Sequence, residues 1–274
     1  MEIYKKQSIT EAFKVYFDQR MIKILLLGAI SGFPWVIIGS SLSLWLKEDG
    51  LSRSTIGWAG LIFAVYAFNY LWAPLIDRIK IPWLTDKVGH RRGWIITMQT
   101  LILICLIFWS LINPSANLAL VISIGLIIAI ASATQDITVD ALRIEQIGES
   151  ESKSMAAGAA MAVVGWWSGY KLGGVIALFT AEYLENIGVI NYWQSTFLIL
   201  GIVVILMNIG LMFVHEPVSI DRQQKQKETD NLIENKLGSK NIITSLTAWI
   251  TSTLAGPIIS FFKKNGFSIA IGIL

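Results

Sequence analysis

The sequence predicts an all-α fold, a polytopic membrane protein with six transmembrane helices, and three observations support this. Hydrophobic residues make up 54% of the 274-residue chain and charged residues only 15%, whereas about 25% is usual in soluble domains. The apolar stretches reach the roughly 20 residues with which a helix crosses the hydrocarbon core. They lack the alternation of barrel strands, and only helices or closed barrels satisfy the backbone within lipid.

Six apolar stretches are long enough to span, and the short connections between them are typical of antiparallel neighbours. The predicted spans are residues 22–46, 56–76, 94–112, 118–139, 155–179 and 193–214. The chain is accordingly divided into an N-terminal segment (1–21), a six-helix domain (22–214), a linker with an interfacial helix (215–265) and a final apolar stretch (266–274).

Lysine and arginine are distributed unevenly between the two sides of the predicted bundle. Of the 22 Lys and Arg residues, only Lys47, Arg53 and Lys171 lie outside the N-terminal residues up to Lys23, the second and fourth connections and the tail after the sixth span. Cytoplasmic loops carry an excess of positive charge. These segments are therefore predicted to be cytoplasmic, with the N-terminus inside.

The tail after the sixth span has three parts. Residues 221–240 are polar and typical of a mobile linker, whereas 241–262 are uncharged and rich in Ser and Thr, which favours an amphipathic helix in the membrane interface. Residues 266–274 would extend only about 13 Å as a helix, less than half the core thickness. They are expected to be the truncated start of a seventh helix of a longer protein.

The fourth span carries polar residues near its predicted cytoplasmic end. Gln135 and Asp136 are followed by Asp140, and the i, i+4 spacing puts both carboxylates on one helix face. Asp136 is one turn deeper, where a charge is costly and commonly functional. Asp136 is therefore a candidate for a proton pathway or a gate. The alternative is that it caps a helix or pairs with the second connection. Asp140 is open to a simpler interpretation as a solvated side chain.

Lys171 is the deepest charge, near the middle or outer half of the fifth span. A lysine at that depth is expected to face a water-filled cavity and to attract an anionic group. Snorkelling to the interface is the alternative. By helix rise, Lys171 and Asp136 are expected to lie about 15 Å apart in depth, so that a direct pair is not expected.

Small residues and a proline mark two other spans. Gly165, Gly169 and Gly173 form a stripe on the fifth span along which another helix can approach closely. Trp166 and Trp167 beside the stripe are interpreted as packing or lipid-facing residues, with stacking on a sugar ring as the alternative. In the first span, the segment from Gly32 to Pro34 predicts a bend, which either borders a binding site or is a simple kink.

No cofactor, metal or nucleic-acid partner is expected. Cys105 is the single cysteine, and His90 and His215 are far apart with no ligand cluster around either. A membrane enzyme is disfavoured because no nucleophile–base set is visible.

The motifs in chain order resemble the AmpG family of muropeptide permeases, within the major facilitator superfamily. The resemblance covers nearly the whole chain and is strongest in the segment from Ser132 to Ala141. The other matching segments are Gly32-Phe33-Pro34, Trp45-Leu46, Gly50-Leu51, Ile56-Gly57, Trp72 to Arg78, Gly89 to Trp94, Gly158-Ala159-Ala160, Gly169 to Gly173, Trp193-Gln194 and Glu216-Pro217. The chain departs from the family pattern in the additional residues 81–88 and in Lys171, where an arginine is expected.

The resemblance implies a proton-coupled importer of anhydromuramyl muropeptides for cell-wall recycling in the bacterial inner membrane. This chain would be the N-terminal six-helix half, a 3+3 inverted repeat, and would need a C-terminal half to complete the transporter. The implied proton or substrate pathway comprises Gln135, Asp136, Asp140, Lys171, Gly32 and Pro34, and the implied gating loop comprises Asp77, Arg78, Arg91 and Arg92.

In the resembled fold the fifth helix lies at the boundary between halves, so its glycine stripe is expected to meet lipid or another chain. Two alternatives stay open for the function. The chain could be an inactive remnant of such a permease, or a carrier for another anionic metabolite such as acetyl-CoA.

Overall fold

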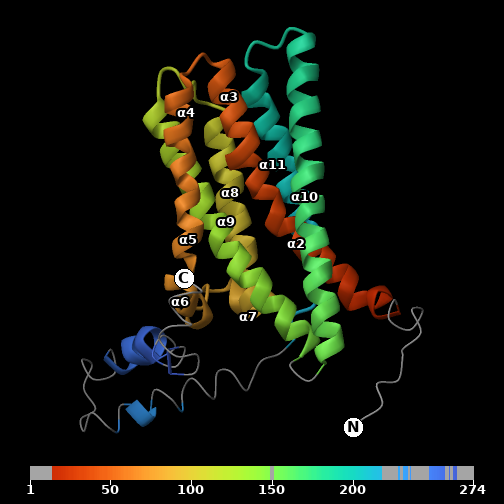
Figure 1. The fold of residues 1–274 in the computed structure, drawn as a ribbon, viewed down its shortest axis with the longest axis vertical. Coiled ribbons are helices and arrows are strands. Elements are labelled where there is room, and N and C mark those ends of the chain that lie inside the picture. Colours follow the sequence, from red (N-terminus) through yellow and green to blue (C-terminus); the bar gives the residue numbers. More distant parts are fainter. Residues whose placement is uncertain are drawn as a thin grey trace. The chain divides into compact units, whose positions relative to one another are not determined.

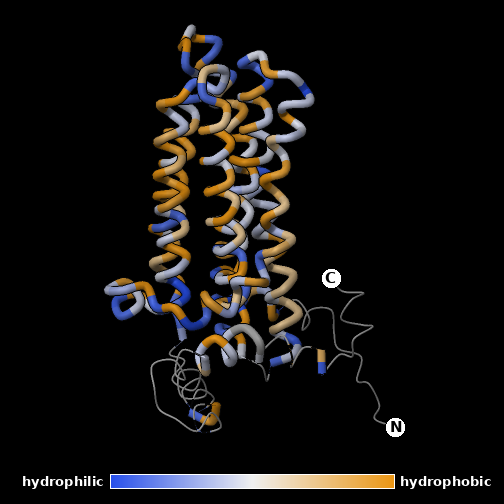
Figure 2. The backbone as a smooth tube through the Cα atoms, turned by 90° about the vertical axis from the view of Figure 1, so that its left-hand side faces the viewer, coloured by the Kyte–Doolittle hydropathy of each residue, from blue (hydrophilic) through white to orange (hydrophobic). Residues whose placement is uncertain are grey.

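The computed structural model describes residues 14–148 and 151–217, and beyond them 228, 231–233, 235, 247–256, 259 and 262–263. All regular structure in this part of the chain is helical (Figure 1). Six helices are long and apolar enough to cross a membrane: Gln19–Glu48, Arg53–Leu71, His90–Trp109, Leu118–Ile147, Ser152–Asn186 and Tyr192–Leu211. Apolar residues predominate along their length (Figure 2). The predicted six-span fold class is confirmed.

The chain forms two compact units. The first comprises Met1–Asn69 and Ile81–Glu216 and contains the helical bundle, and the second comprises Tyr70–Lys80 and Pro217–Leu274. Within the second unit, α6 (Ala73–Arg78) contacts η5 (Thr251–Ala255). Of the predicted interfacial helix 241–262, the described residues are helical, and their place in the membrane stays a prediction. The stretch 266–274 and residues 1–13 lie outside the described residues.

The first span is irregular one turn later than its sequence suggests. It consists of α2 (Gln19–Val36), a π-helical segment η2 (Ile37–Ser41) and α3 (Leu42–Glu48). Pro34 lies inside α2. A proline interrupts the hydrogen-bond ladder of its helix, and π-helical turns are common where a helix must absorb such an irregularity. The predicted bend at 32–34 is therefore a widened turn from Ile37 onward.

The second span ends earlier than predicted. Its pieces are α4 (Arg53–Ala59), η3 (Gly60–Ala64), α5 (Val65–Phe68) and η4 (Asn69–Leu71), of which η3 and η4 are 3-10 turns. Ser52 caps the start by accepting a hydrogen bond from the Thr55 amide at 3.1 Å. Pro74 lies in the first turn of α6, where proline begins a helix readily. A new helix therefore starts within the predicted span 56–76.

The remaining spans are continuous helices, and two of them are much longer than predicted. They are α8 (His90–Trp109), α9 (Leu118–Ile147), α10 (Ser152–Asn186) and α11 (Tyr192–Leu211), with the short helix α7 (Leu84–Val88) before α8. The α9 helix continues eight residues past the predicted end at 139, to Gly148, whose positive φ of 83° suits a helix C-terminus. Hydrophobic residues mark only the part of a helix within the membrane core, so the boundaries predicted from the sequence leave out the polar ends of the helices.

The glycine stripe of the fifth span packs inside the bundle. A Cβ at Gly165 or Gly169 would overlap a carbonyl oxygen of α2, and one at Gly28 or Gly32 would overlap a carbonyl oxygen of α10. The predicted close packing is confirmed. The expectation that this stripe meets lipid or another chain is wrong, because α2 already covers it.

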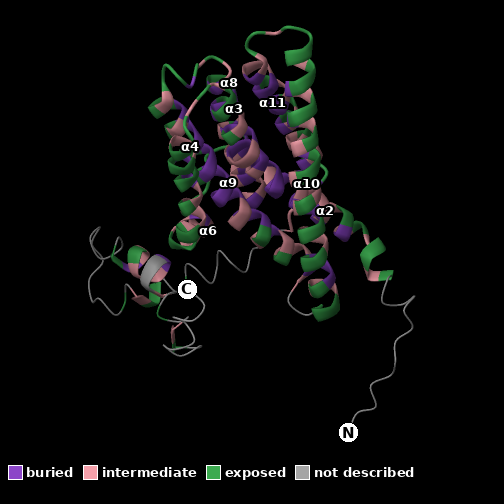
Figure 3. Cartoon of the chain, turned by 45° about the horizontal axis from the view of Figure 1, so that its top comes forward, coloured by how far each residue is buried: buried purple, intermediate pink, exposed green. Residues whose placement is uncertain are grey.

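The spans differ in how deeply they lie in the bundle (Figure 3). In their most apolar windows, 67% of the first span and 56% of the fourth are buried, against 11% of the second and 22% of the fifth. The first and fourth spans therefore form the centre. The second span and the face of α10 turned away from α2 offer apolar surface to their surroundings.

Candidate functional site

Pro34 and Gln135, which the sequence placed in different spans, meet through one backbone carbonyl. Proline has no N–H, so residue 34 cannot donate the helical hydrogen bond that the carbonyl of Ile30 would receive. The buried side chain of Gln135 donates to this oxygen through Nε2 at 2.8 Å. The fourth span thus supplies the hydrogen bond that the first span lacks, in the interior where an unpaired carbonyl is costly.

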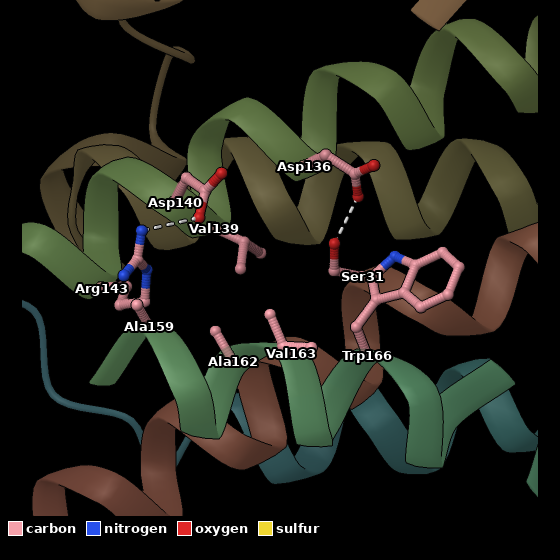
Figure 4. A pocket seen from close by; sticks show the side chains of 10 residues that line it. Ser31, Asp136, Val139, Asp140, Arg143, Ala159, Ala162, Val163 and Trp166 are labelled. Atoms are coloured by element: carbon pink, nitrogen blue, oxygen red, sulfur yellow. Dashed lines mark hydrogen bonds and ion pairs between the residues drawn. The ribbon is translucent and has the colours of Figure 1, made fainter. Parts of the chain in front are cut away.

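The next residue, Asp136, faces the first span as well. The hydroxyl of Ser31 donates a hydrogen bond to its carboxyl oxygen Oδ1 (Figure 4). Both side chains line a cavity of about 330 Å³ between α2, α9 and α10. The other lining residues are Gly28, Val139, Asp140, Arg143, Ala159, Ala162, Val163 and Trp166. The bond to Ser31 is the partner found for Asp136, in place of the alternative pairing with the second connection.

Asp140 lies in the same cavity on a more exposed site. Its side chain is 67% exposed and forms an ion pair with Arg143, with 3.2 Å between Oδ1 and the guanidinium nitrogen (Figure 4). A surface pair of this kind contributes little to stability. The two carboxylates of the predicted face are therefore unequal: Asp136 is half-buried between spans, and Asp140 is exposed.

Aromatic side chains from three spans adjoin this cavity and form what we call the aromatic wall. It comprises Trp35 of α2, Phe63 and Tyr66 of the second span, and Trp166 and Tyr170 of α10. Ring centroids of Trp35 and Tyr66 are 4.5 Å apart, and those of Trp35 and Trp166 are 5.5 Å apart. Trp166 belongs to both the wall and the cavity lining.

Sequence reasoning named Trp166 and Trp167 but missed the wall residues of the first and second spans. Phe63 and Tyr66 are three residues apart and so share a helix face, which is a usable signal. The position of Trp35 directly after Pro34 is a second signal. What no local pattern shows is that these two faces turn toward the same cavity.

Lys171 is exposed and lies outside the cavity lining. Its ammonium is 5.7 Å from the ring centroid of Trp167 and 5.8 Å from that of Tyr170, within the range of cation–π attraction. It makes no ion pair within the described part of the chain. Trp166, beside Asp136 in the cavity, is five residues away, which corresponds to about 7.5 Å of helix rise. The expected depth separation of about 15 Å stays a prediction.

The two arginines predicted for the gating loop lie at the start of α8, where a glutamate from the end of the sixth span caps the helix. The backbone N–H groups of Arg91 and Arg92 donate to the two carboxyl oxygens of Glu216, each at 2.9 Å. An anion at this end also matches the helix dipole. The buried guanidinium of Arg91 pairs with Glu145 of α9 at 3.1 Å. One cluster thus joins the ends of α8, α9 and α11.

Asp77 and Arg78 lie in α6, which belongs to the second compact unit. Their membership of one gating loop with the arginines of α8 stays a prediction. Glu145 was missed from the sequence because a glutamate near a helix end is ordinary, and only the fold brings it to Arg91.

A further ion-pair group joins the starts of the first and fifth spans. The guanidinium of Arg20 pairs with Asp18 at 2.8 Å and with Glu151 at 3.0 Å. Hydrogen bonds from Arg20 lower the pKa of both carboxyls below their ordinary values. Among the described residues, no group of three His, Cys, Asp or Glu side chains is placed to hold a metal ion.

Six apolar spans, with a carboxylate enclosed between spans beside a cavity, define a multi-pass membrane protein of the transporter class. The sequence pattern of the Major Facilitator Superfamily matches residues 24–274, and the chain belongs to that family.

Comparison with individual proteins shows which members of this superfamily the chain resembles. "Putative transporter AmpG 4" of Rickettsia conorii (strain ATCC VR-613 / Malish 7) is 36% identical over 258 residues, which are 94% of this chain and 56% of the relative. "Putative transporter AmpG 1" of Rickettsia bellii (strain RML369-C) is 33% identical over 210 residues, 76% of this chain and 50% of the relative.

The "Anhydromuropeptide permease" of Escherichia coli (strain K12) is 29% identical over 208 residues, which are 76% of this chain and 40% of that protein. The chain thus spans about half the length of the curated relatives it matches. The resemblance to AmpG permeases that the sequence motifs indicated is confirmed.

Proposed function

We propose that these six spans form one half of a proton-coupled permease for anhydromuropeptides in the bacterial inner membrane. The observation that carries the proposal is Asp136, enclosed between the first, fourth and fifth spans and hydrogen-bonded to Ser31. The names of the AmpG relatives support the substrate class. Because the aligned part covers about half of those relatives, the second half of the transporter is part of the proposal.

The place of Asp136 in the bundle supports a role in proton exchange. An ionised carboxylate is expensive in the membrane interior. As a carboxylate it only accepts hydrogen bonds, whereas in the protonated form it also donates one. The bond to Ser31 therefore depends on whether a proton is bound. Ser31 lies on the same helix as Pro34, three residues before it and six before the π-helical segment, so the proton acts close to the irregular part of the first span.

Uptake in proteoliposomes tests this proposal. A complete transporter that contains these six spans is expected to accumulate labelled anhydromuropeptide when a proton gradient, inside alkaline, is imposed. The 274-residue chain reconstituted by itself is expected to insert without accumulating substrate, because alternating access needs two halves. Muropeptide accumulation that does not depend on the proton gradient would contradict the proposal. Accumulation of acetyl-CoA instead of muropeptide would also contradict it.

The orientation is tested separately by labelling single cysteines in a variant without Cys105. Ser115 and Asn186, both exposed, lie in the third and fifth connections and are expected to react from outside the cell. Gln224, in the predicted cytoplasmic linker, is expected to be protected. Labelling at position 224 from outside the cell would contradict the predicted orientation.

A further inference from the structure

The part of the aromatic wall on α10 combines a flat apolar face with a positive charge. The rings of Trp166 and Tyr170 are nearly parallel, at 9° with centroids 5.6 Å apart. Lys171 follows directly, and its ammonium lies near the rings of Trp167 and Tyr170. Trp167 is 51% exposed, so this surface is open beyond the protein.

The wall also carries buried polar atoms. The indole N–H of Trp35 faces the carboxyl of Asp136, and the hydroxyl of Tyr66 faces Ser132. Both side chains lie beside Asp136, so the wall and the cavity are continuous.

Lys171 lies near the middle of its helix. The 35-residue helix α10 has about as much length before this residue as after it, so both ends of the helix are far for a lysine side chain. An ammonium at that depth requires an anionic or aromatic partner. The rings of Trp167 and Tyr170 supply the aromatic partner, and an anion is the partner that the ammonium of Lys171 still lacks among the described residues.

We propose that the aromatic wall and Lys171 form a binding site for a sugar that carries a carboxylate. The sugar ring lies against Trp166 and Tyr170, and its carboxylate pairs with Lys171. This inference rests on the proposed function, because it assigns the substrate of that permease to particular residues.

Three small probes separate the two parts of this site. N-acetylmuramic acid has a sugar ring and a lactyl carboxylate, N-acetylglucosamine has the same ring without the carboxylate, and lactate has the carboxylate alone. The purified 274-residue chain in phosphatidylcholine nanodiscs is titrated with each probe, and binding is followed by saturation-transfer difference NMR. N-acetylmuramic acid is expected to bind at least about tenfold more tightly than N-acetylglucosamine, as a charged hydrogen bond provides. Lactate is expected to bind weakest.

Variants then assign the contacts. Lys171→Ala is expected to lower the affinity for N-acetylmuramic acid to the level of N-acetylglucosamine. The affinity for N-acetylglucosamine is expected to stay unchanged. Lys171→Arg is expected to retain the preference for N-acetylmuramic acid. Tyr170→Ala is expected to weaken both sugars about two- to tenfold. Phe179→Ala is the matched control, because this aromatic residue of the same helix is 68% exposed and lies two turns away from Lys171. Each variant is compared only after its thermal unfolding matches the parent chain.

Several results would overturn the inference. They are failure of N-acetylmuramic acid to bind, equal affinity for the two sugars, or an unchanged preference in Lys171→Ala. Displacement of the sugar by phosphatidylglycerol would assign Lys171 to a lipid headgroup instead. Because the assay measures binding to this chain, it can fail while gradient-driven uptake by the complete transporter succeeds, so the two proposals are tested independently.

Discussion

The first span has two neighbours that hold it in opposite ways. Against α10 it presents Gly28 and Gly32, and the contact is backbone on backbone. Against α9 it presents Ser31 and the carbonyl of Ile30, and the contact consists of hydrogen bonds to Asp136 and Gln135. The glycine contact has no room to relax, whereas under the proposed function the polar contact changes when Asp136 gains or loses a proton. One helix is thus fixed on one side and adjustable on the other.

The largest expected effect comes from a side chain added to the fixed contact. Gly169→Ala places a Cβ against the carbonyl oxygen of Ala29 and is expected to cost about 1–3 kcal/mol of stability, since overpacked sites must shift their backbone. Gly174→Ala is the control, because a Cβ there meets nothing within 4 Å. It is expected to stabilise α10 by up to about 1 kcal/mol. Unfolding in detergent, followed by circular dichroism, measures both, and equal effects would refute the close contact.

On the adjustable side, removal of the titrating group is expected to abolish function and keep the fold. Asp136→Asn retains the shape and the ability to accept from Ser31, but it cannot exchange a proton. Proton-driven uptake by the complete transporter is expected to fall to background. Asp140→Asn, at an exposed carboxylate, is expected to retain most uptake. If the two variants behave alike at equal expression, the distinction between the two carboxylates is wrong.

A third prediction concerns the coupling between Gln135 and Pro34 through the carbonyl of Ile30. Gln135→Leu leaves this oxygen without its side-chain donor and is expected to cost about 1–3 kcal/mol. With Pro34→Ala, residue 34 regains an N–H and can satisfy the carbonyl within the helix. The cost of Gln135→Leu is therefore expected to be smaller in the Pro34→Ala background. A double-mutant cycle on unfolding free energies measures this coupling, and additive costs would show that the two residues act independently.

These contrasts show which parts of the site the sequence could supply. Asp136, Asp140 and the segment from Gly32 to Pro34 were identified because charge, spacing and proline carry meaning within one helix. The same holds for the number of spans and for the glycine stripe. Helix ends were less certain, since α9 continues well beyond its apolar core.

What the sequence could not supply is which faces meet. The bond from Gln135 to Ile30 joins residues 105 positions apart, and the close approach of α2 to the glycine stripe depends on the packing of the whole bundle. The incorrect expectation for the stripe arose for this reason. A stripe of small residues predicts a partner helix but does not identify it.

The smallest expected effect concerns a titratable part of the contact between the first and fifth spans. Arg20, at the start of α2, pairs with Asp18 and with Glu151, the residue before α10. Hydrogen bonds from Arg20 lower the pKa of both carboxyls below the ordinary values of 3.8 and 4.5. The folded chain therefore binds these protons less tightly than the unfolded chain does. The stabilisation is complete above about pH 4.5 and is lost as the pH falls through the lowered pKa values.

Arg20→Gln tests this directly. The difference in unfolding temperature between the parent chain and the variant is expected to be small at pH 7, because exposed pairs are weak, and to shrink further at pH 3. High salt is expected to reduce the difference at pH 7 as well, since exposed charges are screened. The glycine contact has no charge, so the cost of Gly169→Ala should be the same at both pH values and both salt concentrations. If that cost titrates together with the effect of Arg20→Gln, the fixed contact depends on its ion pairs and the contrast between the two sides of the first span is lost.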